Sequence, residues 1–358
     1  MNMNTITLQT PVVQTYRTAQ VAGMFDVPAE NKLTQVIEYE SLPKDDDWQI
    51  GVIAGPSGSG KTTIAKTLAA DNNTAFSGNS GCHDNGNGAA VIDLFAPLPV
   101  QDTIRLLTAV GFSSPPSWLK PYSVLSNGEK FRTDLALALK EAVQAPPQTT
   151  VVFDEYTSVV DRTVAAVCST ALCKGIRSGK IPCRFVAVTC HYDVIEYLEP
   201  DWILDTATGK LSRRLLRRRK PFELEVRRCG RGLWRMFERH HYLSASLPRS
   251  VQCYAAVLNG TAAAFCAVIP QYGQRHWYRI SRIVTLPDYQ GIGIGSRFME
   301  AVGDIYLQRG SRFSITGTHR SVIEHCRRSN RWRLINVNKL KHGRAMVSFE
   351  MVRVKCRV

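Results

Sequence analysis

The chain has 358 residues, of which 44% are apolar and 21% are charged, a balance typical of a folded globular protein and too apolar for a disordered one. No apolar stretch approaches the roughly 20 residues that a membrane-spanning helix needs, and the chain does not open with a cationic segment followed by an apolar core. We therefore expect a cytoplasmic protein with no membrane partner, rather than a secreted protein or a channel.

The net charge of +15 is distributed unevenly along the chain. From residue 212 onward, 29 Lys and Arg oppose 8 Asp and Glu, whereas the preceding residues hold 16 Lys and Arg against 22 Asp and Glu. This length and asymmetry predict an acidic and a basic domain joined by a basic segment. The basic excess also predicts a polyanionic partner, which we expect to be nucleic acid. A generally basic surface with a solvated linker is the alternative.

The ten cysteines are scattered along the chain, and none forms a CxxC pair. Structural zinc sites usually show such paired spacing. Isolated cysteines in apolar surroundings are typical of small buried residues in a reducing compartment. We therefore expect free thiols and no structural metal.

Residues 48–63 read WQIGVIAGPSGSGKTT, a short apolar strand, a glycine-rich loop and the start of an amphipathic helix. This is the phosphate-loop pattern in its strand–loop–helix setting. Glycines let backbone N–H groups surround a polyphosphate, and the helix N-terminus adds a positive dipole end. Lys61 is expected to reach the β- and γ-phosphates, and Thr62 to bind Mg²⁺. The predicted ATP-binding residues of this segment are Gly55, Pro56, Ser57, Gly58, Ser59, Gly60, Lys61, Thr62 and Thr63.

A second apolar strand, residues 151–153, ends in two carboxylates. Asp154 is expected to hold Mg²⁺ through water, and Glu155 to polarise an attacking water as a general base. A later strand, residues 185–189, is followed by Cys190 and His191. Its distance from the acids suits the next strand of the same sheet, so we predict that His191 senses the γ-phosphate.

Residues 125–130, LSNGEK, precede a helical pattern at 131–143. Ser126 and Gly128 at a helix start make a second anion-binding end, suited to the γ-phosphate of a nucleotide held elsewhere. The segment 157–161, TSVVD, follows the paired acids directly and ends at Asp161, which we add to the expected ATP-binding residues.

These four motifs occur in order over about residues 49–210 and resemble the ATP-binding cassette (ABC) ATPases. The loop resembles their Walker A motif, and LSNGEK resembles the LSGGQ signature, with departures at Asn127 and Glu129. The segment from Asp154 to Asp161 resembles the Walker B motif followed by the D-loop, and His191 resembles the switch histidine of this family. The family implies a head-to-tail homodimer in which each signature closes on the ATP of the other copy. The short spacing between Lys61 and Ser126 implies a reduced helical subdomain, which favours a soluble ATPase. The Gly/Asn-rich residues 76–90 are predicted to form a loop.

The second half alternates polar and apolar residues in strand fashion. Strands are expected at 253–258 and 261–269, joined by a turn at Asn259-Gly260, and again at 276–285 and 311–316, with a helix at 296–308. Between the third strand and the helix lies QGIGIG, residues 290–295. Its glycines expose N–H groups to an anion.

A dinucleotide-binding fold could also contain such a loop, but the antiparallel hairpin before it and the missing βαβ unit argue against that fold. The segment resembles the GNAT superfamily of N-acetyltransferases over about residues 225–340, where the corresponding turn grips the pyrophosphate of acetyl-CoA. The resemblance implies these acyl-CoA-binding residues: Ile283, Val284, Gln290, Gly291, Ile292, Gly293, Ile294 and Gly295.

The transferase chemistry is less apparent from the residues. The strand at 276–285 carries no Glu and no Tyr follows Tyr306, although the family commonly places a base and an acid there; His319, His325 and Cys326 are the nearby substitutes. The segment RHHYL at 239–243 resembles the His-His-Tyr segment of Mom-type phage DNA-modification proteins. That resemblance implies catalytic roles for His241 and Tyr242. A helix end with exposed aromatic residues is the alternative.

Together these patterns predict an α/β protein in which a P-loop NTPase (ABC ATPase) domain precedes a mixed α/β GNAT-like acyltransferase domain. The expected parts are an N-terminal extension at 1–47, the ATPase at 48–211, a basic linker at 212–224 and the GNAT-like domain at 225–358. The expected function is ATP hydrolysis with Mg²⁺, coupled to modification of a nucleic acid base by an acyl-CoA donor. The alternatives are an N-acetyltransferase for a protein or small molecule, and an inactive GNAT-like module that binds nucleic acid.

Overall fold

The structure is a computed structural model that describes residues 3–27, 32–43, 47–69, 74–78, 88–144, 149–213, 221–241, 246–339 and 345–353. Its internal contacts divide the chain into two compact units, each made of several segments. The first comprises Met1–Ser80, Ala138–Ser158 and Pro182–Arg218, and the second Gly81–Leu137, Val159–Ile181 and Arg219–Val358. This grouping follows contacts rather than chain order, so the boundaries predicted from the sequence stay predictions.

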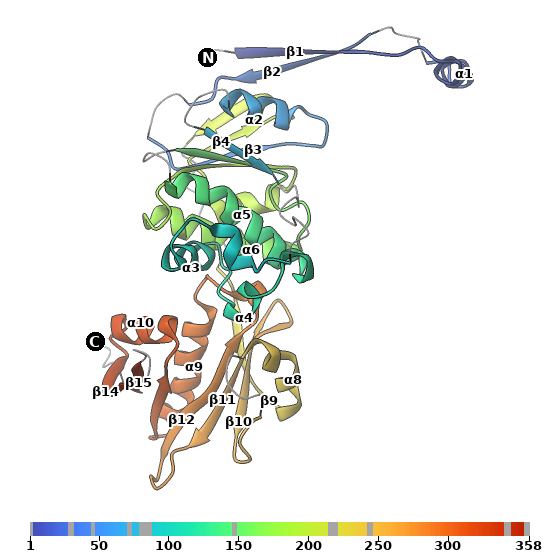
Figure 1. The fold of residues 1–358 in the computed structure, drawn as a ribbon. Helices are drawn as coiled ribbons and strands as arrows, with labels where there is room; N and C mark the ends of the chain where they lie inside the picture. The colour runs from blue at the N-terminus through green and yellow to red at the C-terminus, as the bar shows by residue number, and fades with distance from the viewer. Residues whose placement is uncertain are drawn as a thin grey trace. The chain divides into compact units, whose positions relative to one another are not determined.

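Within the described part of the first unit, six strands form one sheet in the order β4-β5-β6-β3-β7-β8 (Figure 1). All neighbours pair in parallel except β7 and β8. Their bounds are β3 Ile50–Ala54, β4 Thr74–Gly78, β5 Thr150–Asp154, β6 Arg184–Thr189, β7 Trp202–Asp205 and β8 Lys210–Arg213. The central strand β3 is buried along its whole length, as its unbroken apolar run predicts for a parallel sheet.

The loop predicted at residues 76–90 is wrong at its start. Residues 76–78 are the end of β4, where Phe76 pairs with Val152 of the buried strand β5. Pairing with that strand outweighs the turn-forming tendency of the Ser and Gly that follow. Residues 79–87 of the same prediction lie outside the described residues, and residues 91–95 beyond it form a short 3₁₀ helix, η1 (Val91–Phe95).

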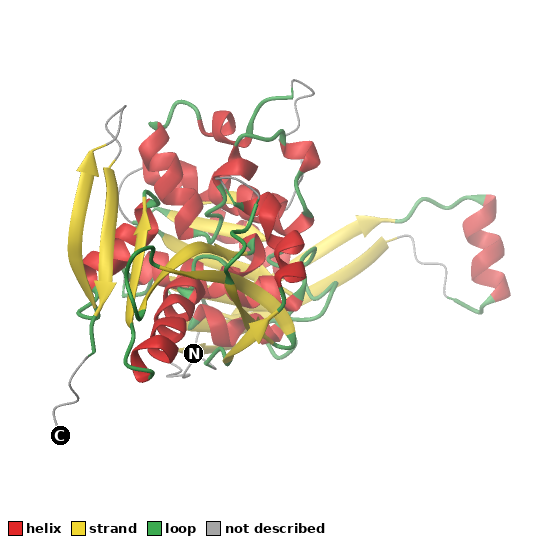
Figure 2. Cartoon of the chain, turned by 90° about the horizontal axis from the view of Figure 1, so that it is seen from below, coloured by secondary structure: helices red, strands yellow, loops and turns green. Residues whose placement is uncertain are grey.

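The N-terminal extension folds as an antiparallel hairpin of β1 (Met3–Pro11) and β2 (Lys32–Glu40). Helix α1 (Tyr16–Met24) lies between the two strands in sequence and at the far end of the hairpin in Figure 2. Near the end of β2, Ile37 and Tyr39 are buried in a core shared with residues of β3, β6 and β7. The extension therefore belongs to the first unit.

The other elements described before position 213 are helices. In the first unit these are α2 Lys61–Ala69, η3 Tyr192–Val194 and α7 Ile195–Leu198. In the second unit they are η1, α3 Val100–Ala109, α4 Pro115–Trp118, η2 Tyr122–Val124 and α6 Arg162–Arg177, while α5 (Asn127–Gln144) begins in the second unit and ends in the first. No helix in the described ranges is long and apolar enough to span a membrane.

The C-terminal part of the second unit is built on a sheet in the order β14-β15-β13-β12-β11-β10-β9 (Figure 1). The strands are β9 Leu224–Cys229, β10 Gln252–Leu258, β11 Thr261–Pro270, β12 Trp277–Thr285, β13 Arg312–Gly317, β14 Trp332–Lys339 and β15 Ala345–Met351. The hairpin predicted at Asn259-Gly260 is confirmed, since both residues have left-handed φ angles, 50° and 80°, as a two-residue turn requires.

Helices cover both faces of this sheet. Helix α9 (Ile294–Gln308) packs on one face through a core that includes Phe298 and Val302. Trp234 and Phe237 of the short helix α8 pack on the other face, against Phe265 of β11. The remaining helical segments of this part are η4 Arg231–Leu233, α8 Trp234–Phe237, η5 Glu238–His240, η6 Pro287–Tyr289 and α10 Arg320–Arg328.

Strands β12 and β13 are parallel neighbours, but their pairing is short. It joins residues 277–280 to residues 312–315. Beyond that point, residues 281–285 of β12 pair only with β11 among the described strands. The pairing of β12 with β13 therefore ends before β12 leads toward the glycine-rich loop.

Candidate functional sites

The glycine-rich loop after β3 is anchored by residues at the ends of both neighbouring strands. The Gly55 N–H donates to the Thr189 carbonyl at the end of β6, at 3.3 Å. On the other side, Thr206 Oγ1, just past β7, lies 2.5 Å from Ser59 Oγ. A Cβ at Gly55 would overlap the Thr206 side chain, so this close approach requires glycine.

The inside of this loop is built to receive an anion. Gly58 and Gly60 have left-handed φ angles of 77° and 85°. Among the described residues, the backbone N–H groups of Ser57, Gly58 and Gly60 have no hydrogen-bond acceptor. The Lys61 ammonium donates to the Pro56 carbonyl at 2.7 Å. Converging N–H groups and a cation at the start of α2 can bind a polyphosphate.

Strand β2 contacts this loop, which the sequence analysis did not foresee. The Gln35 side chain donates to the Gly58 carbonyl at 3.1 Å. A Cβ at Gly60 would overlap Ile37, at 2.3 Å from its Cδ1 atom. The alternating pattern of residues 32–40 could have indicated the strand, but nothing in the sequence indicates its contact with the loop.

The predicted carboxylates and His191 follow strands of the same sheet. Parallel strands place their carboxyl ends at one edge, so Asp154 at the end of β5 and His191 after β6 share the edge that carries the loop after β3. Asp154 Oδ1 accepts from the Glu155 N–H at 2.9 Å. Glu155 is exposed and has a left-handed φ of 53°, a conformation seen at sites where a side chain must be aimed.

Backbone and hydroxyl groups connect the two strand ends. Thr189 Oγ1 donates to the Tyr156 carbonyl at 2.9 Å and accepts from the His191 N–H at 3.0 Å. Thr189 therefore links Tyr156, the residue after Glu155, to His191. The described residues hold no cluster of three or more His, Cys, Asp or Glu side chains suited to a metal. Thr62 on the first turn of α2 and Asp154 at the end of β5 are the residues that could hold a cation beside a bound phosphate.

The LSNGEK segment forms the N-terminus of α5 through a reciprocal capping box. Ser126 Oγ accepts from the Glu129 N–H at 3.3 Å, while Glu129 Oε2 accepts from the Ser126 N–H at 3.0 Å. Burial alone would raise the pKa of Glu129, but hydrogen bonds from Ser117 and Ser126 outweigh it, so the pKa is lowered. Glu129, a departure from the signature pattern, therefore has a structural role in this chain.

Asp161 also begins a helix. Its carboxylate accepts from the Thr163 N–H at 2.8 Å and caps α6. Asp161, Ser126 and Gly128 belong to the second unit, whereas the residues of the glycine-rich loop after β3 belong to the first.

The second glycine-rich loop lies between η6 and α9. Gly291 and Gly293 have left-handed φ angles of 89° and 91°. The N–H groups of residues 291–293 have no acceptor among the described residues, and this loop is partly exposed at the helix N-terminus. A Cβ at Gly295 would lie 2.9 Å from Thr285 Oγ1, so this position needs glycine for close packing. The loop can bind an anion through its backbone.

The predicted acyl-CoA residues have different roles in the structure. Gln290 Oε1 accepts from the Ser113 N–H at 2.9 Å, and its Nε2 donates to the Thr285 carbonyl at 2.8 Å. The Gln290 side chain is thus used within the chain, which leaves anion binding to the backbone that follows. Val284 is buried beside α8, while Ile283 packs on the other face of the sheet.

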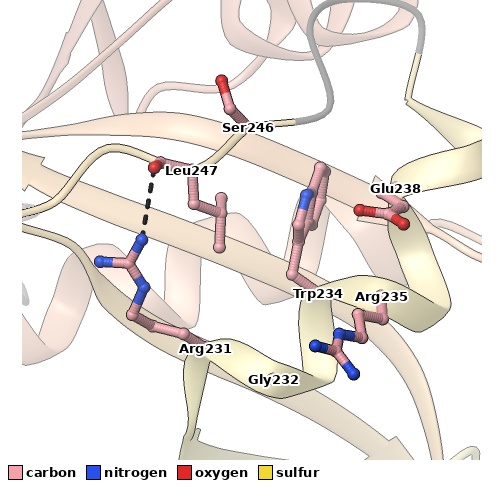
Figure 3. A pocket seen from close by; sticks show the side chains of 7 residues that line it. All are labelled: Arg231, Gly232, Trp234, Arg235, Glu238, Ser246 and Leu247. Atoms are coloured by element: carbon pink, nitrogen blue, oxygen red, sulfur yellow. Dashed lines mark hydrogen bonds between the residues drawn. The ribbon is translucent and has the colours of Figure 1, made fainter.

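A pocket of about 350 Å³ lies beside α8, within the range of small-molecule sites (Figure 3). It is lined by Arg231, Gly232, Trp234, Arg235, Glu238, Ser246 and Leu247. The Arg231 guanidinium donates to the carbonyls of Leu247 and Arg249, so it fixes one wall. His241 packs edge-on against Trp234 with ring centroids 5.6 Å apart. Tyr242, predicted beside it, lies outside the described residues.

Three groups near the sheet are candidate proton carriers, namely His319, His325 and Cys326. His319 lies at the N-terminus of α10, two residues past β13, and burial lowers its pKa so that the neutral imidazole is favoured. His325 Nε2 lies 2.9 Å from Glu300 Oε1 of α9, and Cys326 is buried in the core. Burial raises the pKa of Cys326 to about 12, so its thiol stays protonated at neutral pH. A neutral imidazole can accept a proton, so His319 is a candidate for that role.

Comparisons with known proteins identify a family for part of the chain. Residues 217–322 match the acetyltransferase (GNAT) family. A search of curated protein sequences finds no significant match. Among solved structures, the "IAA acetyltransferase" of Bacillus cereus is 13% identical, with a TM-score of 0.30 over 36% of this chain and 99% of its own. A Bacillus subtilis acetyltransferase in complex with CoA is 11% identical, with a TM-score of 0.31 over 37% and 100%.

The other half of the chain has a structural neighbour of a different kind. A dimeric bacterial ABC transporter cassette is 15% identical, with a TM-score of 0.35 over 50% of this chain and 90% of its own. Such low scores carry no argument about activity, so the assignment rests on the family match. The C-terminal part of the chain carries an acetyltransferase domain of the GNAT family, preceded by an α/β region with a phosphate-loop sequence.

Proposed function

We propose that the chain is an ABC-type ATPase joined to a GNAT-type acyltransferase, with ATP, Mg²⁺ and acetyl-CoA as its ligands. The observation that carries this proposal is a pair of glycine-rich loops, residues 55–62 and 290–295, each of which leads into a helix N-terminus. In each loop, several backbone N–H groups have no acceptor among the described residues. One chain thus offers two separate anion sites.

In the first site, the loop N–H groups and Lys61 bind the β- and γ-phosphates. Thr62 and Asp154 hold Mg²⁺, whose charge offsets that of the phosphates. Glu155 orients the attacking water, and His191 contacts the γ-phosphate. The resemblance to ABC ATPases adds Ser126, Gly128 and Asp161 from a second copy, so that ATP joins a homodimer.

In the second site, the backbone of residues 291–295 binds the pyrophosphate of acetyl-CoA. The thioester arm lies along β12 beyond Ile280, where the pairing of β12 with β13 has ended. An acceptor amine attacks the thioester carbonyl, the C–S bond breaks, and the CoA thiolate leaves and is protonated. His319, kept neutral by burial, takes the proton that the amine loses.

The acceptor that this site favours is a nucleic acid base. The region from residue 212 carries 29 Lys and Arg against 8 Asp and Glu, enough to hold a phosphate backbone. The pocket of Figure 3 adds Arg231, Arg235 and Trp234, whose ring contacts that of His241. A protein or small-molecule acceptor is the second candidate, because the family match alone is to an acetyltransferase.

The nucleotide half is tested by two variants of the full chain. Lys61→Ala should abolish ATP binding measured by calorimetry, and normal affinity would contradict the site. Glu155→Gln should keep ATP binding, lose hydrolysis and convert the chain into an ATP-dependent dimer on gel filtration. Hydrolysis at the normal rate would show that Glu155 is not the catalytic residue.

The transferase half is tested with acetyl-CoA labelled in the acetyl group. The chain is incubated separately with duplex DNA, RNA and a protein extract, and label is followed into each fraction. Label in a nucleic acid fraction is the expected result. Label in protein alone would favour the second candidate, and failure to bind acetyl-CoA would indicate an inactive binding module. His319→Ala should reduce transfer while leaving acetyl-CoA binding intact.

A further inference from the structure

The acyl-CoA loop and the first part of the signature helix α5, up to Leu137, belong to the same compact unit, and an ion pair between Arg132 and Asp288 joins them. Arg132, on the first turns of α5, has a completely buried side chain, and its Nη1 donates to Asp288 Oδ1 at 3.1 Å. Asp288 lies in η6, two residues before the loop, and its side chain is 46% exposed. A buried guanidinium left without its carboxylate is strongly unfavourable, so Arg132 holds η6 in place.

Two further contacts bind the loop to the helical segment that precedes α5. Gly291 touches Gly111 so closely that a Cβ on Gly291 would lie 2.7 Å from the Gly111 Cα. Beside them, Gln290 accepts the hydrogen bond from the Ser113 N–H. The conformation of the acyl-CoA loop is therefore set by residues on both sides of the signature segment.

The Asp288 carboxylate also lies against the signature itself. A methyl group built on Gly128 would be 3.0 Å from Asp288 Oδ1. The N-terminus of α5 thus already has a negative charge beside it, where the proposed function places the γ-phosphate. Two negative charges at this separation repel each other, and Arg132 can neutralise only one of them.

We infer that Asp288 is a positioning residue that couples the two ligands: Mg-ATP at the signature displaces Asp288 from Arg132 and loosens the acyl-CoA loop. Each ligand then weakens binding of the other by the same factor, because binding free energies are linked. This inference rests on the proposed function of both loops. The inference also implies an order of events, in which acetyl-CoA binds most tightly to the chain when no ATP is bound at the signature.

The experiment uses the full chain carrying Glu155→Gln, so that ATP is bound but not consumed. The Kd for acetyl-CoA is measured by calorimetry with and without saturating Mg-ATP, and the Kd for Mg-ATP with and without acetyl-CoA. We expect each ligand to raise the Kd of the other about five-fold or more. Equal Kd values, or tighter binding of either ligand, would overturn the inference.

The role of the Asp288 charge is tested by adding Asp288→Asn to the Glu155→Gln chain, because asparagine keeps the shape of the side chain. The ratio of Kd values with and without the other ligand should fall to about one. Asp304→Asn is the matched control, since Asp304 on α9 is 41% exposed and pairs with Arg331. It should keep the full ratio. A ratio that survives in the Asp288 variant would overturn the role of this carboxylate.

A second variant covers the case in which Asp288→Asn fails to fold around the unpaired Arg132. Arg132→Met removes the buried charge and leaves the half-exposed Asp288 solvated, and it should also abolish the ratio. The two proposals fail differently. A chain that does not bind one of the ligands overturns the proposed function and the coupling with it, whereas a chain that binds both independently overturns the coupling alone.

Discussion

Gly291 and Gly293 offer a matched pair for testing the contact between the acyl-CoA loop and the segment before α5. Their φ angles, 89° and 91°, are nearly the same, so alanine at either position costs about 1–2 kcal/mol for a left-handed conformation. A Cβ on Gly293 meets nothing within 4 Å, whereas one on Gly291 lies 2.7 Å from the Gly111 Cα and 3.0 Å from the Ala171 Cβ. This overlap with backbone adds about 1–3 kcal/mol to the cost at Gly291.

The assay is differential scanning calorimetry of the two variants beside the parent chain. At about 2–4 °C of Tm per kcal/mol for a region of this size, Gly291→Ala should melt at least 2 °C below Gly293→Ala in the transition of the second unit. Circular dichroism of each variant before heating serves as the folding control. Equal losses of Tm would show that the Gly111–Gly291 contact does not form, and would remove one support of the coupling argument.

Three other predictions address the signature cap, an acid-sensitive ion pair and the basic surface. Glu129→Ala removes the acceptor for Ser117 and Ser126, so it should lower the unfolding free energy by about 1–2 kcal/mol. Glu129→Gln should lower the unfolding free energy by less. Urea unfolding of both variants checks this, and equal losses would contradict the capping role. A hydrogen bond from Arg312 lowers the pKa of Glu350 below its usual value of 4.5, so its stabilisation is complete above pH 4.5 and is lost as the pH falls through the lowered pKa. Urea midpoints from pH 6 downward should show this fall, and Glu350→Gln should reduce it. The logarithm of the Kd for duplex DNA should rise linearly with the logarithm of the salt concentration, because each neutralised phosphate releases counterions. A Kd that does not change with salt in filter binding would contradict the nucleic acid proposal.

Much of the site could be predicted because its chemistry is local in sequence. The strand, glycines, Lys61 and helix start of the first loop are contiguous, and so are the third strand, the glycines and the helix of the second. The turn at Asn259-Gly260 needs two left-handed residues in a row, which few sequences supply. The Ser126–Glu129 spacing is itself a capping-box pattern that the sequence analysis did not use.

The contacts that were not predicted join distant parts of the chain. Arg132 and Asp288 are 156 positions apart, and nothing near either residue indicates that it will be buried or paired with the other. Gln290 matches the family pattern, yet its side chain bonds to Ser113 because the preceding helices pack beside the loop. The N-terminal hairpin likewise becomes part of a core only through Ile37 and Tyr39, whose partners come from other strands.

The central claim is that one chain carries a triphosphate site and a separate acyl-CoA site. It is tested most directly by calorimetric titration of a single preparation of the full chain, in which one aliquot is titrated with Mg-ATP and another with acetyl-CoA. We predict one saturable site per chain for each ligand, with Lys61→Ala removing the first and leaving the second. A chain that binds only one of the two, or that loses both sites in the Lys61 variant, would contradict the account.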